Sequence, residues 1–233
     1  MELQWIEGEF LSRPNRFVAQ VVVDGKQEGA HVPNTGRLQE LLLAGVPVRL
    51  TVHEDPGRKY RLSLRQVKYK GIWVSIDSQL PNRLVGQALV KGLIFPEEEW
   101  DRIQPEAKEG ESRFDFALHK ESLTRWIEVK GVTLERDGWG YFPDAPTSRG
   151  TRHIKHLQSL VEAGHEAAVI FVIQNAWAEG ITPNEEKDPA FAQAVREAAQ
   201  AGVQFLAYCW RFDGQEETFI GKRPVRFQNG QDL

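Results

Sequence analysis

Short hydrophobic stretches ended by turn-forming residues fill the first third of the chain. Residues 17–23, 46–52 and 72–76 are rich in β-branched and other hydrophobic residues, and Asp24-Gly25 ends the first of these runs. Such runs predict strands. Residues 37–43 have instead the spacing of a short helix. About five strands with one short helix in about 80 residues predict a small closed β-barrel similar to the oligonucleotide-binding (OB) fold.

The rest of the chain mixes helical and strand periods. Hydrophobic runs typical of strands occur at 112–118, 126–134, 140–142, 167–173 and 203–210. Helical spacing occurs at 83–91, in a stretch that ends near Glu106, at 149–162 and at 189–201. Three of these helices follow a residue that can cap them, namely Asn82, Ser148 and Asp188. The order predicts an α/β (α+β) sandwich with a mixed central sheet. Pro81 and Asn82 predict a boundary between a barrel domain, residues 1–82, and a second domain, residues 83–233.

Composition narrows the class of protein. Of the 233 residues 41% are hydrophobic, which is enough for a packed core, and the one cysteine, Cys209, excludes an internal disulfide and a multi-cysteine zinc site. The longest apolar run, 167–173, is too short to span a bilayer, so we expect a cytoplasmic protein with no membrane segment. The net charge of −4 hides an asymmetry: residues 1–82 hold 11 Lys and Arg against 9 Asp and Glu, and residues 83–233 hold 18 against 24.

Within the first domain, the segment 58–70 is strongly basic, with six basic residues and no acidic one. Lys59, Arg61 and Arg65 alternate with hydrophobic residues, so a strand would carry basic groups on one face. The alternation changes phase near Gln66, which predicts a bulge. Two interpretations remain open at this point: a surface that follows a phosphate backbone, or the ordinary solvated side of a sheet.

The stretch "RWIEVK" at 125–130 carries the strongest candidate chemistry. In a strand Glu128 and Lys130 share one face. The chain has three Glu-x-Lys triplets, and only this one lies in a strand-like run. If the preceding run is its antiparallel neighbour, Asp115 faces Glu128. Two converging carboxylates suit Mg²⁺ or Mn²⁺, and Lys130 could orient or deprotonate a water, or neutralise charge on a phosphate. The alternative is a structural ion pair on a half-exposed strand.

The arrangement of Asp115 with Glu-x-Lys resembles the core of the PD-(D/E)XK nuclease superfamily. Over nearly its whole length the chain also resembles the sugar fermentation stimulation protein A family. The segments that carry this resemblance are "RPNRF", "HVPNTGRL", "PNRL", "SRFDF", "EVKGVTL", "YFPDAPTSRGTRH" and "DPAF". The resemblance implies an OB barrel followed by a PD-(D/E)XK nuclease-like domain, DNA binding, a link to sugar utilisation and DNA/RNA nuclease activity.

The same resemblance implies residue roles. It makes Glu106 the carboxylate of a helix, Asp115 and Glu128 metal ligands, the main-chain carbonyl of Val129 a further ligand, and Lys130 the catalytic lysine. Glu109 and Glu111 stand close to Glu106 and would replace it if the register were shifted, and the alternative role of Glu106 is helix solvation.

Other residues are candidates for contact with nucleic acid. Ser148 can cap a helix on whose polar side Arg149, Arg152, His153 and His156 gather near the positive N-terminus, where phosphate is favoured. Asp144 either supports the site from a loop or is a turn residue. Gly36 with Arg37 forms either a turn or a phosphate contact. The full set of predicted nucleic-acid contacts is Lys59, Arg61, Arg65, Arg37, Arg113, Arg149 and His153.

Three functions follow as hypotheses. The first is a Mg²⁺- or Mn²⁺-dependent DNA/RNA nuclease that binds nucleic acid through its barrel. The second is a non-catalytic DNA-binding regulator of sugar metabolism genes that keeps a nuclease scaffold. The third is a metal-dependent hydrolase of small phosphate compounds. The sequence predicts no oligomeric state.

Overall fold

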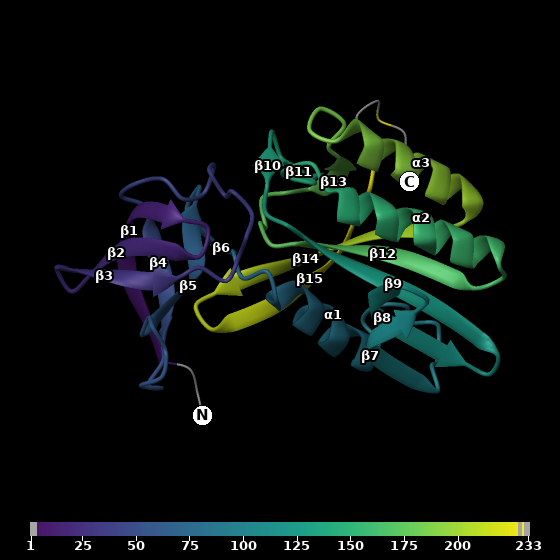
Figure 1. The fold of residues 1–233 in the computed structure, drawn as a ribbon, viewed down its shortest axis with the longest axis horizontal. Coiled ribbons are helices and arrows are strands. Elements are labelled where there is room, and N and C mark those ends of the chain that lie inside the picture. The colour runs from purple at the N-terminus through teal and green to yellow at the C-terminus, as the bar shows by residue number, and fades with distance from the viewer. Residues whose placement is uncertain (1–3, 228–229, 231–233) are drawn as a thin grey trace.

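The chain folds into a β-barrel and a larger α/β domain that lie side by side (Figure 1). A computed structural model describes residues 4–227 and residue 230. Within that part of the chain no helix is both long enough and apolar enough to cross a membrane.

Five strands close the barrel. They are β1 (Gln4–Asn15), β2 (Val18–Val23), β3 (Lys26–His31), β4 (Pro47–Val52) and β5 (Leu62–Tyr69). Antiparallel pairs join β4 to β1, β1 to β2, β2 to β3 and β4 to β5, and a parallel pairing of β3 with β5 closes the ring. Inward side chains such as Val21, Leu50 and Leu64 are fully buried. The predicted OB-like barrel is therefore confirmed.

Two details of the barrel test the sequence patterns. The bulge expected near Gln66 is confirmed, because the register of β4 and β5 shifts between the pairs Leu50↔Leu64 and Arg49↔Gln66. The short helix expected at 37–43 is wrong, since turns replace it. Leu38 has φ 53°, a left-handed backbone that cannot continue a helix.

One mixed sheet runs through the second domain in the order β15-β14-β12-β9-β8-β7. These strands are β7 (Arg102–Glu109), β8 (Ser112–Lys120), β9 (Leu123–Val132), β12 (Glu166–Ile173), β14 (Gln204–Asp213) and β15 (Glu216–Arg223). The pairs β9–β12 and β12–β14 are parallel and the others antiparallel, so the mixed sheet is confirmed. A small second sheet contains β10 (Glu135–Arg136), β11 (Trp139–Phe142) and β13 (Gly180–Pro183).

Helices cover both faces of the large sheet. α2 (Ser148–Glu162) and α3 (Pro189–Ala201) share a hydrophobic core with one face, which we call the α2/α3 core, and α1 (Leu80–Val90) shares the α1 core with the other face. As expected, Asp188 caps α3 by accepting a hydrogen bond from the N–H of Phe191 at 3.0 Å.

Three predictions about helices are wrong. Asn82 is not a cap, because α1 begins at Leu80 and Asn82 lies inside its first turn. Ser148 does not cap α2, because the cap is Thr147, whose Oγ1 accepts from the N–H of Gly150. No helix ends near Glu106, because that residue lies in β7, which pairs with β8 along its length. The cross-strand partners of β7 decide its conformation, and they are not visible in local periodicity.

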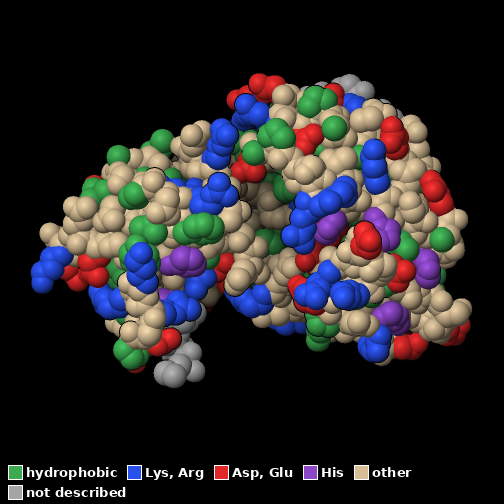
Figure 2. All heavy atoms as spheres, viewed as in Figure 1, with side chains coloured by type: hydrophobic (Ala, Val, Ile, Leu, Met, Phe, Trp, Pro, Cys, Tyr) green, Lys and Arg blue, Asp and Glu red, His purple; other side chains and the backbone are tan. Residues whose placement is uncertain are grey.

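A short strand and a connector join the two domains. β6 (Ile72–Ser75) pairs with β5 on the barrel side and meets β14 through Trp73 opposite Phe212. The connector that follows, residues 76–79, leads directly into α1. Figure 2 shows a hollow between the barrel and the second domain.

Candidate functional site

Adjacent strands bring Asp115 and Glu128 together. Phe116 pairs with Ile127 across β8 and β9, and the same register extended by one pair places Asp115 opposite Glu128. The alternation of β8 breaks at Asp115, since Phe114 lies in the α2/α3 core and Phe116 in the α1 core. The carboxylate therefore sits where the strand changes its facing side, between buried aromatic residues.

Two hydrogen bonds hold the Asp115 carboxylate. Asn82 on α1 donates from Nδ2 to Oδ1 at 2.5 Å, and the main-chain N–H of Val129 donates to Oδ2 at 2.7 Å. Burial and, after it, the negative charge of Glu128 together raise the pKa of Asp115 to about 6, against the opposing effect of these hydrogen bonds and Lys130. Near neutral pH this carboxyl therefore sits close to the point at which it gains a proton, and a cation could take the proton's place.

Glu128 is more deeply buried and is held ionised. Its Oε1 forms an ion pair with Lys130 Nζ and lies 2.7 Å from Nδ1 of His153, which donates to it in the tautomer protonated at Nδ1. Burial raises the pKa of Glu128, but His153 and Lys130 outweigh burial and leave the pKa below its ordinary value. Oε2 is buried and has no hydrogen-bond partner among the described residues. Such an oxygen is costly unless something outside the chain satisfies it.

His153 belongs to this site and not to the helix surface. The sequence placed it on the polar side of α2, yet its exposed fraction is 7% and its ring meets Phe114 nearly edge-on at 5.8 Å. His156 also turns inward, and its Nδ1 lies 2.7 Å from Ser112 Oγ. The helix period alone could not separate the polar face from a face that buries one polar side chain against a carboxylate.

Glu106 has a different setting from the one expected. It is exposed on β7, has φ 51°, and forms an ion pair with Arg113 at 3.6 Å. The helix that contacts Asp115 is α1, and the group it offers is the Asn82 amide. Asn82 was missed as a site residue because it resembled a helix cap, although "PNRL" was among the segments that carry the family resemblance. The ligand role of Glu106 stays a prediction.

The residues present fit a hard divalent cation better than zinc. In the described part of the chain no group of three or more His, Cys, Asp and Glu side chains could hold a metal ion. Mg²⁺ needs fewer protein ligands, since it keeps several waters and binds through one or two carboxylates plus substrate phosphates. Asp115 and Glu128 would be the two carboxylates of such a site, and the Oε2 of Glu128 has no hydrogen-bond partner among the described residues.

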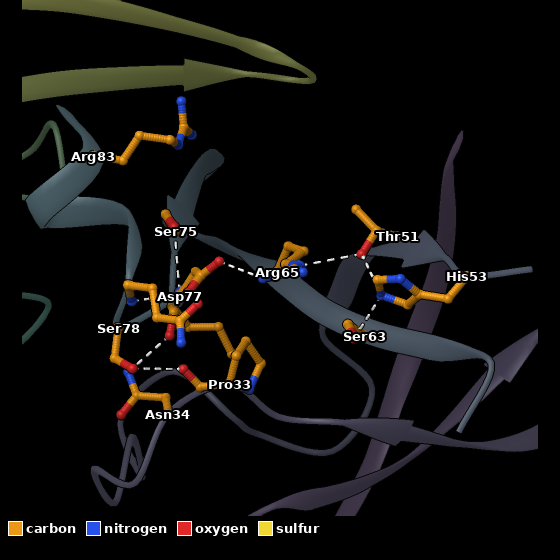
Figure 3. A network of polar contacts seen from close by, with 12 residues as sticks. Pro33, Asn34, Thr51, His53, Ser63, Arg65, Ser75, Asp77, Ser78 and Arg83 are labelled. Carbon is orange, nitrogen blue, oxygen red and sulfur yellow. Dashed lines mark hydrogen bonds and ion pairs between the residues drawn. The ribbon is translucent and has the colours of Figure 1, made fainter. Parts of the chain in front are cut away.

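The predicted nucleic-acid contacts of the barrel separate into two kinds. Lys59 is exposed, and Arg61 forms a mostly exposed ion pair with Glu28 at 3.0 Å. Arg65 instead turns inward, where it pairs with Asp77 and donates from Nε to Thr51 at 3.1 Å (Figure 3). Arg65 therefore holds the connector of the two domains, which the alternation of the strand did not reveal.

Basic side chains also gather beside the interdomain hollow. Figure 2 shows Lys and Arg side chains over the start of α2, next to the hollow. Arg149, Arg152 and Lys155 are the exposed basic residues of this part of α2. Arg37 is exposed on the barrel loop.

Comparisons with known proteins place these observations in context. A family model described as the sugar fermentation stimulation protein RE domain matches residues 79–216, and one described as the SfsA N-terminal OB domain matches residues 11–76. A sugar fermentation stimulation protein homolog of Acetivibrio thermocellus is 46% identical over 97% of each chain. A homolog of Caldanaerobacter subterraneus is 46% identical over 87% of this chain and 89% of its own. The structure of Pyrococcus furiosus SfsA in complex with Ca²⁺ has 31% identity and a TM-score of 0.87 over 96% of each chain.

Proposed function

The chain belongs to the sugar fermentation stimulation protein family, with an OB domain and a restriction-endonuclease-like (RE) domain, and from this premise we propose that it is a Mg²⁺- or Mn²⁺-dependent nuclease. Its substrate is DNA or RNA, and the bond it hydrolyses is the phosphodiester bond. The observation that carries this proposal is the buried carboxylate pair, in which Glu128 Oε2 has no partner within the described chain.

The cation site we propose uses Asp115 and Glu128, with the main-chain carbonyl of Val129 as a further ligand. The structure of the Pyrococcus relative contains Ca²⁺, which supports binding of a divalent cation in this family. A bound Mg²⁺ or Mn²⁺ supplies Lewis-acid chemistry, because it polarises a phosphoryl oxygen and lowers the pKa of a bound water. Asn82 keeps Asp115 in place by its hydrogen bond to Oδ1.

Lys130 and His153 act from the other side of Glu128. His153 fixes the orientation of the Glu128 carboxylate and contributes to its ionised state, since it binds Oε1. Lys130 carries its ammonium on the same face of β9, where it would neutralise charge that develops on the phosphate or orient the attacking water. Each of these roles uses a contact that already exists in the folded chain.

Binding of nucleic acid relies on exposed cations of both domains. Lys59, Arg61 and Arg37 lie on the barrel, and Arg149 and Arg152 lie on α2 beside the hollow. Phosphate contacts of this kind give binding that weakens as salt increases. Arg113 is a further exposed cation of this kind on β8, where it pairs with Glu106 at 3.6 Å.

A cleavage assay tests the proposal. Purified protein is mixed with labelled single-stranded and double-stranded DNA and RNA in Mg²⁺, Mn²⁺ or EDTA. We expect metal-dependent cleavage that falls at least a hundredfold in Asp115→Ala and Lys130→Ala, with Glu216→Gln, an exposed carboxylate of β15, as the matched control. Cleavage that persists in both site variants would refute the assignment of the site. Salt-sensitive binding of DNA without cleavage by any preparation would favour the DNA-binding regulator.

A further inference from the structure

A cavity of ≈ 340 Å³ lies between the barrel and the RE domain. Its walls come from the barrel loop 34–38, the connector at Ser78, the end of β9, and the loop 141–147. Gly131 lines it and directly follows Lys130, while Thr147 lines it as the cap of the helix that carries His153. Two of its walls are therefore continuous in the chain with the strand and the helix that carry the candidate site, and residues of both domains are needed to form it.

The barrel wall of this cavity is held rigidly. The Arg13 guanidinium donates to the carbonyls of Asn34, Gly36 and Arg37 at 2.7, 2.7 and 2.8 Å. Asn34 Oδ1 accepts from the N–H of Gly36, and its Nδ2 donates to the carbonyl of Ile76 at 2.7 Å. The same guanidinium also donates to the carbonyl of Arg16 at 2.7 Å. One side chain therefore binds four carbonyls and fixes the conformation of the loop.

Glycine at position 36 brings the two walls close. A Cβ atom added there would come within 2.9 Å of Asp144 Oδ2, a distance that Cβ atoms essentially never show in folded proteins, and within 3.0 Å of Asn34 Oδ1. The loop of the barrel and the loop of the RE domain thus nearly touch. The separation of the two loops at this point is therefore smaller than the width of a duplex, whose grooves alone are about 6–12 Å wide.

The lining has the chemistry of a nucleobase site and not of a phosphate site. None of the described residues that line it is Lys, Arg or His. Apolar groups from Leu38, Pro143 and Pro146 stand beside the amide of Gln174 and the carboxylate of Asp144. Apolar walls with a few hydrogen-bonding groups recognise a flat, neutral base, and a carboxylate accepts from exocyclic amines. The exposed Arg37 lies within the barrel loop, and the exposed Arg149 lies two residues beyond Thr147, so both suit phosphates outside the cavity.

We infer that the cavity takes one unpaired nucleobase of the strand being cut, next to the scissile phosphate. This inference rests on the proposed function and narrows its substrate class to nucleic acid that is single-stranded at that nucleotide. Asp144 and the Oε1 of Gln174 accept from the edge of the base, and Leu38, Pro143 and Pro146 pack against it. A base that stays paired cannot enter.

The test uses the full-length Asp115→Ala protein in Ca²⁺, so that binding is measured without cleavage. Short single strands carry one 2-aminopurine, placed at each position in turn. We expect a fluorescence change at one position, and about tenfold or greater loss of affinity when that nucleotide is made abasic or is paired with a complement. Ala145→Phe fills the cavity and should reproduce this loss, whereas Ala163→Phe on the exposed end of α2 should not.

The outcomes separate this inference from the proposed nuclease activity. A position-specific loss in binding supports the base pocket even if the wild-type chain cleaves nothing, in which case only the proposed function fails. Equal affinity for intact, abasic and paired substrates, with Ala145→Phe and Ala163→Phe indistinguishable, would overturn the base pocket even if cleavage is robust. Both variants are checked first for a wild-type thermal unfolding curve, and Ala145→Leu replaces Ala145→Phe if the larger side chain prevents folding.

Discussion

Replacing Asp115 by Asn should stabilise the metal-free protein while it abolishes the response to metal. The pKa of Asp115 is about 6 in the folded chain, against 3.8 ordinarily, because the carboxyl is buried beside Glu128. Asn has the shape of the protonated acid. The new asparagine side chain can keep both hydrogen bonds. Its oxygen accepts from the N–H of Val129, and its amide nitrogen donates to the oxygen of Asn82 once the Asn82 amide has rotated by a half-turn.

The size of the effect follows from proton linkage. Between pH 3.8 and about 6 the folded chain holds a proton on Asp115 that the unfolded chain has released, so the free energy of unfolding falls as pH rises through this window. Each pKa unit corresponds to about 1.4 kcal/mol, which gives at most about 3 kcal/mol above pH 6. Water that reaches the partly exposed carboxyl lowers this value, so we expect Asp115→Asn to gain about 1–3 kcal/mol at pH 8 and almost nothing at pH 4.

The assay compares the two proteins in EDTA by thermal and urea unfolding at several pH values. A gain of 1–3 kcal/mol corresponds to a rise of roughly 2–12 °C in Tm for a chain of this size. With added Mn²⁺ the wild type should gain stability by mass action and Asp115→Asn should not. Asn82→Asp is a useful companion, because a third carboxylate at the site should lower metal-free stability.

Two results would refute the reasoning. One is a stability difference between wild type and Asp115→Asn that does not depend on pH from 4 to 8, since the linkage would then be absent. The other is a variant that loses stability at pH 8, which would mean that the negative charge of Asp115 contributes to the fold through its donors.

Four further substitutions should each change a different measured property. Lys130→Ala should reduce cleavage at least a hundredfold and leave metal-induced stabilisation in place, as measured by single-turnover kinetics and thermal shift. Asn82→Ala should weaken metal affinity about 10–100-fold, as measured by titration with Mn²⁺, because the carboxylate it orients becomes free to move. Arg61→Ala should mainly reduce the salt dependence of DNA binding. Arg65→Ala should mainly lower stability by about 1–3 kcal/mol, because it leaves a partly buried Asp77 unpaired, and equal effects of these two variants would contradict the structure.

Much of the fold could be predicted because most of its strands have a hydrophobic pattern that is visible in the sequence. The run 167–173 is buried on both faces of the sheet and reads as continuous hydrophobic residues, as central parallel strands do. The sequence did not predict β7 because Ala107 is its one buried residue, whereas Arg102, Glu106 and Lys108 are exposed. Such an edge strand has no hydrophobic alternation to detect, and its pairing with β8 defines it.

Only part of the candidate site could be predicted from the sequence, for a related reason. Glu128 and Lys130 share a strand face by simple alternation, and the ion pair between them agrees with that expectation. His153 and Asn82 come from two helices on opposite sides of the sheet, far apart in sequence from the strands. Local periods report whether a helix has a polar face, but tertiary packing decides which polar residue turns inward.

The connector between the domains explains why the barrel matters for chemistry in the RE domain. Asp77 pairs with Arg65 of the barrel and accepts from the N–H of Gln79 at 3.0 Å, at the start of α1. Gln174, at the end of β12, donates to the carbonyl of Ser75 at 3.2 Å and so ties the same connector to the central sheet. The first turn of α1 then presents Asn82 to the carboxylate of the site. Because one continuous segment is fixed by the barrel at one end and holds the carboxylate at the other, the position of that carboxylate depends on how the barrel is docked.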